Sequence, residues 1–159
     1  MAIDLNELLA RCAEIETAAI LSNFAVTVDA KPYFMHQQES FPYFTNRIAG
    51  DEISYDSNEF DRDTYTVIIR LIIGHATAGY QGESESTLYD YIPVIKTAFN
   101  TNEGLISTSY AAAMTALIEG DTARMNSHSG FRVFQDGGLI GVTQVGTEFV
   151  LTCLFNEDL

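Results

Sequence analysis

Residues 63–74 read DTYTVIIRLIIG, and the alternation in this stretch decides the fold class that the sequence predicts. Side chains at every second position of a β-strand share one face of its sheet. One face of this stretch is wholly apolar and consists of Tyr65, Val67, Ile69, Leu71 and Ile73. The other face consists of Thr66, Ile68, Arg70 and Ile72, with an arginine between two isoleucines. We therefore expect helices to cover the first face and a partner to cover part of the second.

The length and composition are typical of one globular domain, which we expect to span residues 1–159. A chain of this size buries roughly 70% of its unfolded surface, and 47% of its residues are apolar. No apolar run approaches the ~18 residues of a membrane-spanning helix. The first ten residues lack the basic segment of a secretory signal. The sequence thus predicts no association with a membrane.

Acidic residues dominate the charge, because 22 Asp and Glu stand against eight Lys and Arg, for a formal net charge of −14. The bases are scattered singly along the sequence, whereas binding to a phosphate backbone needs clustered Lys and Arg. The simplest explanation of the acidity is solubility. The alternative is a surface that must avoid sticking to nucleic acid, such as the wall of a channel through which DNA slides. The composition is compatible with both.

The N-terminal stretch has the periodicity of an amphipathic helix. It is expected to run from about Asp4, a suitable N-cap with Glu7 at the capping-box position, to about Leu21. Its apolar stripe consists of Leu5, Leu8, Leu9, Cys12, Ile15 and Ala19. This stripe predicts docking on a sheet.

A second amphipathic helix is expected to begin at Ser84 or Ser86. Its inner face consists of Leu88, Tyr91, Ile92, Ile95 and Phe99. Pro93 lies within it, so either the helix kinks there, which we favour, or a fresh helical turn begins at the proline.

The segment between the first helix and the central strand is expected to be extended. Phe24, Val26 and Val28 alternate with other residues, as in a short strand. Pro32 and Pro42 favour extended geometry in the residues that precede them. The nearby aromatic residues are expected to form a satellite core, and they are Tyr33, Phe34, Phe41, Tyr43 and Phe44.

Residues 49–63, AGDEISYDSNEFDRD, form the most charge-dense segment. An EF-hand does not fit, because Asp61 would stand at the sixth position, where the calcium loop requires glycine. A solvated, mobile hairpin loop is the preferred interpretation, and a calcium site is the alternative. Ile53 and Tyr55 would let the tip of this loop pack against a neighbouring subunit.

The last third of the chain predicts a β-hairpin. Within residues 101–129, either a helix around residues 110–117 or two short strands fits the pattern. Two β-patterns follow, at residues 129–135 and 139–155, and the turn sequence at residues 136–138 joins them. In the second, one face consists of Phe149, Leu151, Cys153 and Phe155, and the other of Glu148, Val150, Thr152 and Leu154. Gly141 and Gly146 mark a bulge or bend.

Motifs for catalysis or cofactor binding are absent from the sequence. It contains no nucleophile elbow, phosphate-binding loop or dinucleotide-binding glycine pattern, and no Cys or His cluster at metal-ligand spacing. His75 is solitary, and Ser127 and His128 are neighbours only in sequence. Cys12 and Cys153 lie on apolar faces and are expected to be buried thiols. We therefore expect no enzymatic activity, no catalytic residue, no cofactor and no metal site.

Four stretches carry a resemblance to a known family: the first helix DLNELLARCAEIE, the strand TYTVIIRLII, the second helix STLYDYIPVIKTAF and the last strand VGTEFVLTCLF. In this pattern and order the chain resembles the tail terminator, or tail completion, proteins of long-tailed bacteriophages. The resemblance covers nearly the whole chain and lies in pattern rather than in a diagnostic motif. Residues 101–129 are longer than expected for a minimal member. It implies an α+β fold in which two main helices pack on one face of a mostly antiparallel sheet.

The resemblance further implies a structural virion protein of the phage tail and neck, assembled in the host cytoplasm as a hexameric ring. Such a ring caps the tail tube, stops its polymerisation and joins the tail to the head-side connector. Its partners would be the tail tube protein and the head-side connector protein, and DNA would pass through without specific binding. Candidate subunit or partner contacts are Ile68, Arg70, Ile72 and Val150. Candidate acids facing the lumen or a partner are Asp51, Glu52, Asp56, Glu59 and Asp61.

Two other functions fit the sequence. A head–tail connector or neck protein, either an adaptor or a stopper, shares the size, the acidity and the lack of an active site. A small soluble ligand-binding or enzymatic α+β domain would have one deep apolar pocket enclosing His75 or His128. If the ring interpretation holds, Arg70→Glu is expected to weaken assembly while leaving each copy folded.

Overall fold

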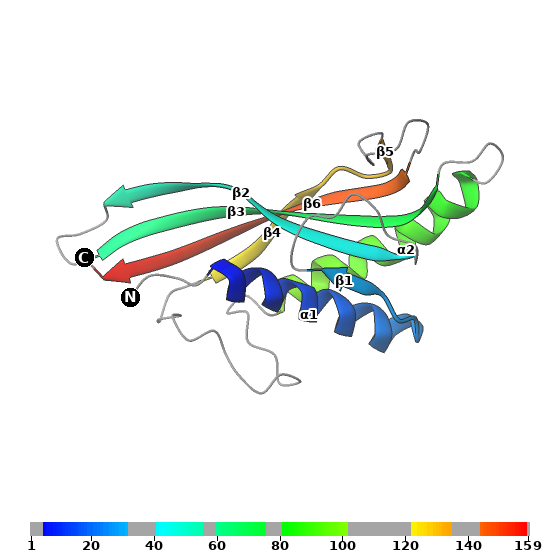
Figure 1. Ribbon diagram of the computed structural model, residues 1–159, viewed down its shortest axis with the longest axis horizontal. Coiled ribbons are helices and arrows are strands. Elements are labelled where there is room, and N and C mark those ends of the chain that lie inside the picture. The colour runs from blue at the N-terminus through cyan, green and yellow to red at the C-terminus, as the bar shows by residue number, and fades with distance from the viewer. Residues whose placement is uncertain are drawn as a thin grey trace.

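The structure, a computed structural model, describes residues 5–31, 41–55, 60–75, 81–101, 122–134 and 144–158. These residues form two helices and a mixed, mostly antiparallel sheet, so the fold is α+β, as predicted (Figure 1). The elements are α1 (Leu5–Phe24), β1 (Asp29–Lys31), β2 (Tyr43–Tyr55), β3 (Phe60–His75), α2 (Gln81–Asn100), β4 (Thr122–His128), β5 (Arg132–Phe134) and β6 (Gln144–Asp158). No helix in the described part of the chain is long and apolar enough to span a membrane.

The two longest strands, β3 and β6, lie at the centre of the sheet. Their antiparallel pairing runs from Phe60 opposite Asp158 to His75 opposite Gln144. The strand order is β1-β2-β3-β6-β4, with β5 also paired to β6, and only the β1–β2 pair is parallel. The pattern in residues 63–74 therefore predicted the central strand correctly, although β3 begins earlier, at Phe60.

Strands β4 and β5 pair with different parts of β6 and are separated by residues 129–131. At this break the backbone N–H of Ser129 donates to the Glu148 carbonyl at 2.8 Å. The Glu148 N–H in turn donates to the Ser129 hydroxyl oxygen at 3.0 Å. Gly130 adopts a φ of 68°, which glycine tolerates without a steric penalty. The Ser129 hydroxyl thus replaces a backbone carbonyl as the acceptor for β6 at the break between β4 and β5.

The main core lies between the two helices and one face of the sheet. Val67, Ile69 and Leu71 are fully buried there, and Tyr65 and Ile73 are partly buried against the same core. Both helices lie on the same side of the sheet in Figure 1. The prediction that this face of β3 packs beneath helices is confirmed. Cys12 and Cys153 are also confirmed as buried, free thiols.

Helix α1 forms where the apolar stripe predicted a helix, but it continues three residues past Leu21, to Phe24. The ring of Phe24 packs against Tyr91 of α2, with the ring centroids 4.8 Å apart. Ala25 then ends the helix with a φ of 54°, and its N–H donates to the Leu21 carbonyl at 3.0 Å. Residues 24–28 were predicted to be a short strand or an extended segment. Phe24, packed on α2, is helical, and residues 25–28 form no strand, so the strand alternative is wrong.

Helix α2 begins at Gln81, earlier than predicted, and is one helix that includes Pro93. Pro93 is exposed, whereas the predicted inner face is buried, and its members are Leu88, Tyr91, Ile92, Ile95 and Phe99. The apolar face therefore holds the helix on the core on both sides of the proline.

The acidic segment at residues 49–63 is not the loop that the sequence predicted. Residues up to Tyr55 belong to β2, and residues from Phe60 belong to β3, with Asp51 opposite Tyr65 and Glu52 opposite Thr64. Residues 56–59 lie outside the described residues. Pairing with β3 determines this conformation despite the low strand propensity of Asp and Glu.

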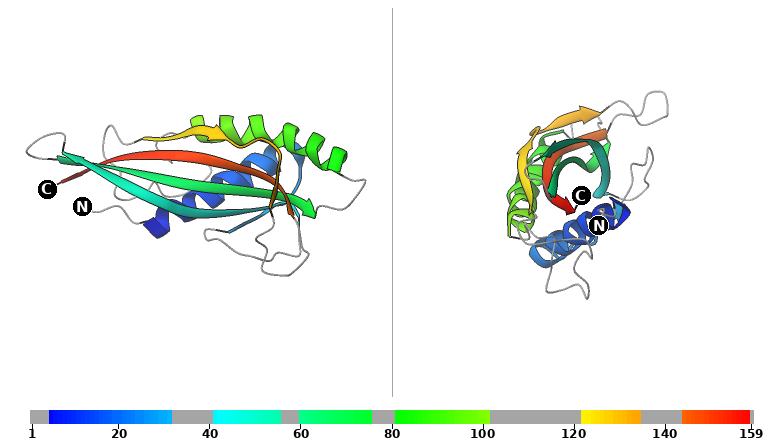
Figure 2. Two further views of the ribbon diagram at one scale, coloured as in Figure 1. Left: turned by 90° about the horizontal axis from the view of Figure 1, so that it is seen from above. Right: turned by 90° about the vertical axis from the view of Figure 1, so that its left-hand side faces the viewer.

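Three strands continue beyond the helices at one end of the molecule, as Figures 1 and 2 show from different directions. We call this part the three-stranded extension, and it comprises residues 53–55 of β2, 60–63 of β3 and 155–158 of β6, which lie past the last pair between β4 and β6.

Strand β4 was not predicted. The predictions for residues 102–121 and for the turn at residues 136–138 concern residues outside the described ranges. Of the predicted aromatic cluster, Phe44 joins the main core, while Tyr43 packs with Phe41 in a second cluster. Tyr33 and Phe34 lie outside the described residues. The satellite core is therefore confirmed for Phe41 and Tyr43.

Candidate functional site

The face of the sheet opposite the helices is the main candidate for a functional surface, and we call it the open face. Its members follow from the strand register, because directly paired residues project to the same side. One row contains Tyr43, Ile72, Gly146 and Arg132, and the next Thr45, Arg70 and Glu148. The third contains Arg47, Ile68, Val150 and Ser127, and the fourth Gly50, Thr66, Thr152 and Arg124. All four predicted contact residues on β3 and β6 therefore lie on this face.

Ile72 is not exposed on the open face. Its side chain has an exposed fraction of 0% and forms a small second core with Tyr43 and Phe134, against which Phe41 packs. This correction to the candidate contact set arises because β5 places Phe134 over the end of β3. Ile72 stabilises the fold and does not present a surface to a partner.

Arg70 is held in a cluster that joins β3, β5 and β6. Its guanidinium lies 3.1 Å from a carboxylate oxygen of Glu148 and 4.2 Å from the ring centroid of Phe134. Arg132 approaches the same Glu148 oxygen at 3.7 Å and the same ring at 5.5 Å. The side chains of Arg70 and Glu148 are only 11% and 18% exposed. The cluster is therefore chiefly structural, with Arg132 on its exposed side.

Ile68 and Val150 form the accessible apolar part of the open face. They are directly paired across β3 and β6, and both are half-buried. Arg47 lies beside Ile68 on β2 and is exposed. Arg124 is exposed on β4, one row away. A small apolar centre with arginines on both sides is a combination that protein interfaces favour.

Bases that are scattered in the sequence are therefore gathered in space. Among the side chains that the structure describes, four arginines lie on the open face, and they are Arg47, Arg70, Arg124 and Arg132. The acids among the same side chains are Glu52 and Glu148. The two helices, by contrast, contain six acids and two bases in their sequences. A chain of net charge −14 thus has a face on which bases outnumber acids among the described residues.

The acidic candidates that the structure describes lie in strands β2 and β3 rather than in a loop. Asp51 and Glu52 are exposed on β2 and, as consecutive strand residues, project to opposite faces. Asp61 lies in β3 opposite Tyr55 and Glu157. Asp56 and Glu59 lie outside the described residues. Asp51 and Glu52 therefore do not form one acidic surface.

A buried carboxyl group was missed by the sequence analysis. Glu16 has an exposed fraction of 0%, and its Oε1 accepts a hydrogen bond of 2.8 Å from the amide of Asn46. Burial raises the pKa of Glu16 well above its ordinary value, and the Asn46 hydrogen bond opposes this shift. The spacing of Glu16 could have predicted its burial, because it lies four residues from both Cys12 and Ile20, which are buried on the same face of α1.

The thiols of Cys12 and Cys153 are buried in the core, as Glu16 is. Burial raises the pKa of Cys153 to about 12 and that of Cys12 well above its usual value. Thiols with raised pKa values are poor nucleophiles at neutral pH, because little thiolate forms. Cys12, Glu16 and Cys153 are therefore core residues that an external substrate does not reach.

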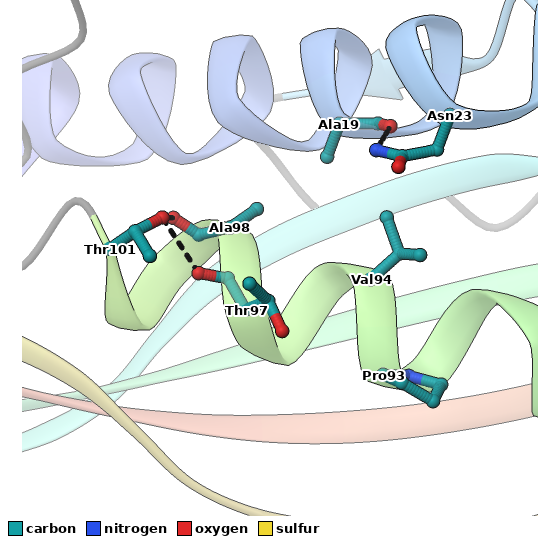
Figure 3. Close-up of a pocket in the computed structure, with 7 residues that line it drawn as sticks. All are labelled: Ala19, Asn23, Pro93, Val94, Thr97, Ala98 and Thr101. Atoms are coloured by element: carbon teal, nitrogen blue, oxygen red, sulfur yellow. Dashed lines mark hydrogen bonds between the residues drawn. The ribbon is translucent and has the colours of Figure 1, made fainter.

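Two hollows flank helix α2. One, of about 410 Å³, lies between α1 and α2 and is lined partly by Ala19, Val94 and Ala98 (Figure 3). Two of its polar side chains bond to their own helices, since Asn23 donates to the Ala19 carbonyl at 2.8 Å and Thr101 to the Thr97 carbonyl at 2.8 Å. The hollow therefore offers few polar groups to a ligand.

The other hollow, of about 430 Å³, lies between α2 and β4 and includes His128. Six of its seven lining residues are exposed, and the exception is Ile92. The Nδ1 atom of His128 accepts a hydrogen bond of 3.1 Å from the Gly130 N–H. This hollow is a surface depression rather than the deep apolar pocket expected of a small-molecule site.

Within the described ranges, no group of three or more His, Cys, Asp or Glu side chains is placed to hold a metal ion. A scan against protein-family models and a search of curated proteins find no match to this chain.

Proposed function

We propose that this chain is a structural virion protein that acts as a tail terminator in a long-tailed bacteriophage. Copies of the chain assemble into a ring, hexameric as the family resemblance implies. The ring caps the tail tube, stops its polymerisation and joins the tail to the head-side connector. DNA passes through the ring without specific binding.

The open face is the observation that carries this proposal. Its half-buried Ile68–Val150 pair is flanked by the exposed Arg47 and Arg124. A partly accessible apolar pair flanked by arginines on a sheet is suited to a protein contact, because both kinds of side chain are favoured at interfaces. A subunit that forms a ring needs such a surface.

The overall charge supports the proposal that DNA passes through the ring without binding to it. The chain has a net charge of −14, and a ring of such chains would repel the phosphates of DNA passing through it. Repulsion of this kind lowers friction in a channel, since a bound phosphate would arrest the DNA.

Size-exclusion chromatography with light scattering tests the ring directly. The purified chain is expected to elute as a discrete oligomer with a mass close to six times 17.6 kDa. A strictly monomeric particle at high protein concentration would contradict the proposal.

A polymerisation assay separates a terminator from a head–tail connector. Tail tube protein is allowed to polymerise with and without the chain, and tube lengths are measured by electron microscopy. A terminator shortens the tubes and is found at their ends. A chain that leaves tube length unchanged but binds the portal-side adaptor is a connector.

A further inference from the structure

We infer that the open face of one copy docks on the outward surface of α1 and α2 of a second copy. We call that outward surface the helix layer, and its described members include Glu7, Glu14, Leu21, Glu85, Tyr89 and Asp90. The inference rests on the proposed function, because it names the two surfaces through which the subunits of the ring meet.

Charge complementarity favours the helix layer of a second copy as the partner of the open face. On the open face the bases outnumber the acids by four to two among the described side chains. The accessible charged side chains of the helix layer are four acids and one base, and they are Glu7, Glu14, Glu85, Asp90 and Lys96. The remaining described helix charges, Arg11 and Glu16, are buried, and Arg11 bonds to Glu14 at 2.6 Å. Opposite charges facing one another across an interface increase its association rate and specificity. A second copy of this chain therefore supplies an acidic surface that fits the open face.

The same charges disfavour a symmetric dimer through two open faces. Such a contact would bring Arg47 and Arg124 of one copy close to the arginines of another. Like charges placed together at an interface disfavour association. Contact between two helix layers would bring carboxylates together in the same way. The charges therefore favour contact between an open face and a helix layer over contact between two like surfaces.

Apolar side chains are available on both surfaces. Leu21 is 50% exposed and Tyr89 is 53% exposed on the helix layer, while Ile68 and Val150 are half-buried on the open face. Burial of exposed aromatic and aliphatic side chains supplies most of the favourable free energy of association. The charges would set the orientation of the contact, and the apolar groups would stabilise it.

The contact is heterologous, because the two surfaces lie on opposite sides of one sheet. Each copy then uses its open face toward one neighbour and its helix layer toward the other. Contacts of this kind close into a ring or continue as an open filament, depending on the rotation between copies. A closed ring through these surfaces is the arrangement that the proposed function requires.

Two charge-reversed variants test the pairing. Arg47→Glu/Arg124→Glu makes the open face acidic, and Glu85→Lys/Asp90→Lys makes part of the helix layer basic. Each variant alone is expected to associate about tenfold or more weakly than the wild type in light-scattering measurements. An equimolar mixture of the two is expected to regain the wild-type mass, because every contact again joins opposite charges.

Lys96→Glu is the matched control. It changes the net charge by as much as Arg47→Glu, but the exposed Lys96 belongs to α2, so association is expected not to weaken. Circular dichroism and urea unfolding of each variant identify loss of fold, and a variant that fails to fold is replaced by the milder Arg47→Gln/Arg124→Gln or Glu85→Gln/Asp90→Asn.

The outcomes separate the inference from the proposed function. A monomeric wild type overturns both. If the wild type forms a ring but the folded variants assemble normally, or the mixture fails to restore assembly, the pairing is wrong and the ring stands. Binding of duplex DNA by the wild type that Arg47→Glu/Arg124→Glu abolishes would also overturn the pairing, because the open face would then bind a polyanion.

Discussion

Glu16 is a carboxyl group in the middle of an apolar core, where a charge is costly. It lies on α1 and accepts a hydrogen bond from Asn46 of β2, so one polar contact joins the helix to the sheet. Because burial raises its pKa, the neutral acid is favoured in the folded protein. The polar pair fixes the position of α1 along the strand, since any slide of the helix would separate the two side chains.

This pKa shift makes stability depend on pH. Glu has a pKa of about 4.3 in the unfolded chain, and the value in the folded protein is raised. The stabilisation from neutral Glu16 is therefore fully present below about pH 4 and is lost as the pH rises through the folded-state pKa. Glu16→Gln is isosteric with the neutral acid. We expect it to match the wild type at low pH and to exceed its stability increasingly at higher pH.

Urea unfolding of the wild type and Glu16→Gln between about pH 4 and pH 9 measures the difference. Asp90→Asn, at an exposed site on α2, is the control and should follow the wild type. A difference between the wild type and Glu16→Gln that does not change with pH would contradict the assignment.

Ala25, at the end of α1, has a backbone conformation that is unfavourable for alanine. Its φ of 54° is in the left-handed region, which costs an L-residue roughly 1–2 kcal/mol. Because Ala25 is exposed, its methyl group contributes little packing. We expect Ala25→Gly to raise the free energy of unfolding by about 0.5–1 kcal/mol. A thermal melt tests this, and a lowered Tm would contradict it.

At the scale of elements, the backbone of β3 leaves no room for a side chain at Gly146 of β6. A Cβ atom added there would overlap the backbone carbonyl oxygen of Leu71, next to a register shift between Ile72 and Gly74. Gly146→Ala is therefore expected to destabilise the protein by about 3 kcal/mol, since backbone must move.

Gly50 provides the control for this substitution. A Cβ at Gly50 meets no atom within 4 Å, so Gly50→Ala is expected to be neutral or slightly stabilising. Chemical unfolding of both variants compares the two sites. Equal stabilities would show that the strands can separate at Gly146 without cost.

The Arg70–Glu148 pair joins β3 to β6, and its burial changes an expectation drawn from the sequence. Arg70→Glu was expected to weaken assembly and leave each copy folded. With side chains only 11% and 18% exposed, a glutamate at position 70 would face Glu148 in a poorly solvated site. We now expect Arg70→Glu to destabilise the fold itself by about 3 kcal/mol.

Urea unfolding should show this loss, and the double variant Arg70→Glu/Glu148→Arg should recover part of it. Lys96→Glu, at an exposed site on α2, is the control, with an expected change within about 0.5 kcal/mol. If Arg70→Glu unfolds at the wild-type urea concentration, the pair contributes nothing to stability.

The sequence predicted the elements whose apolar side chains follow a regular period. The stripe through Leu8 and Cys12 predicted α1, and the alternation from Val67 to Leu71 predicted β3. Strand β4 could not be predicted from its sequence, TARMNSH, because only two of its described side chains are apolar and buried. The register shift between Met125 and Ser127 also breaks the alternation.

The open face could not be predicted as a unit, because its parts meet through pairing between distant segments. Arg47, Arg70 and Arg124 are far apart in sequence and converge only when β2, β3, β6 and β4 align. The faces of β3 and β6 were each predictable by themselves. Their mutual register, and therefore the neighbours of Ile68 and Arg70, was not.

At the scale of the whole molecule, the excess of acids opposes folding through self-repulsion. Added salt screens this repulsion, because the Debye length falls from about 30 Å at 0.01 M to about 3 Å at 1 M. We expect the dilute, unassembled chain to become more resistant to urea as sodium chloride is raised over this range. The contact between open face and helix layer should weaken over the same range.

Unfolding midpoints and light-scattering masses at several salt concentrations test these opposite trends together. Sodium chloride is compared with an uncharged osmolyte of equal osmolality, which leaves the electrostatics unchanged. An unfolding midpoint that falls with added salt would contradict the role of self-repulsion.

The central position of β6 has a consequence for how the chain folds. Strand β6 follows every other described strand in sequence, yet it pairs with β3, β4 and β5. The ion pair between Arg70 and Glu148 spans 78 residues of sequence, and contacts of such separation slow folding because long loops must close first. During synthesis the sheet stays divided until residues 144–158 leave the ribosome. The open face, to which β6 contributes Glu148 and Val150, therefore forms only once β6 is in place. Under the proposed ring, a partly made chain would lack this contact surface.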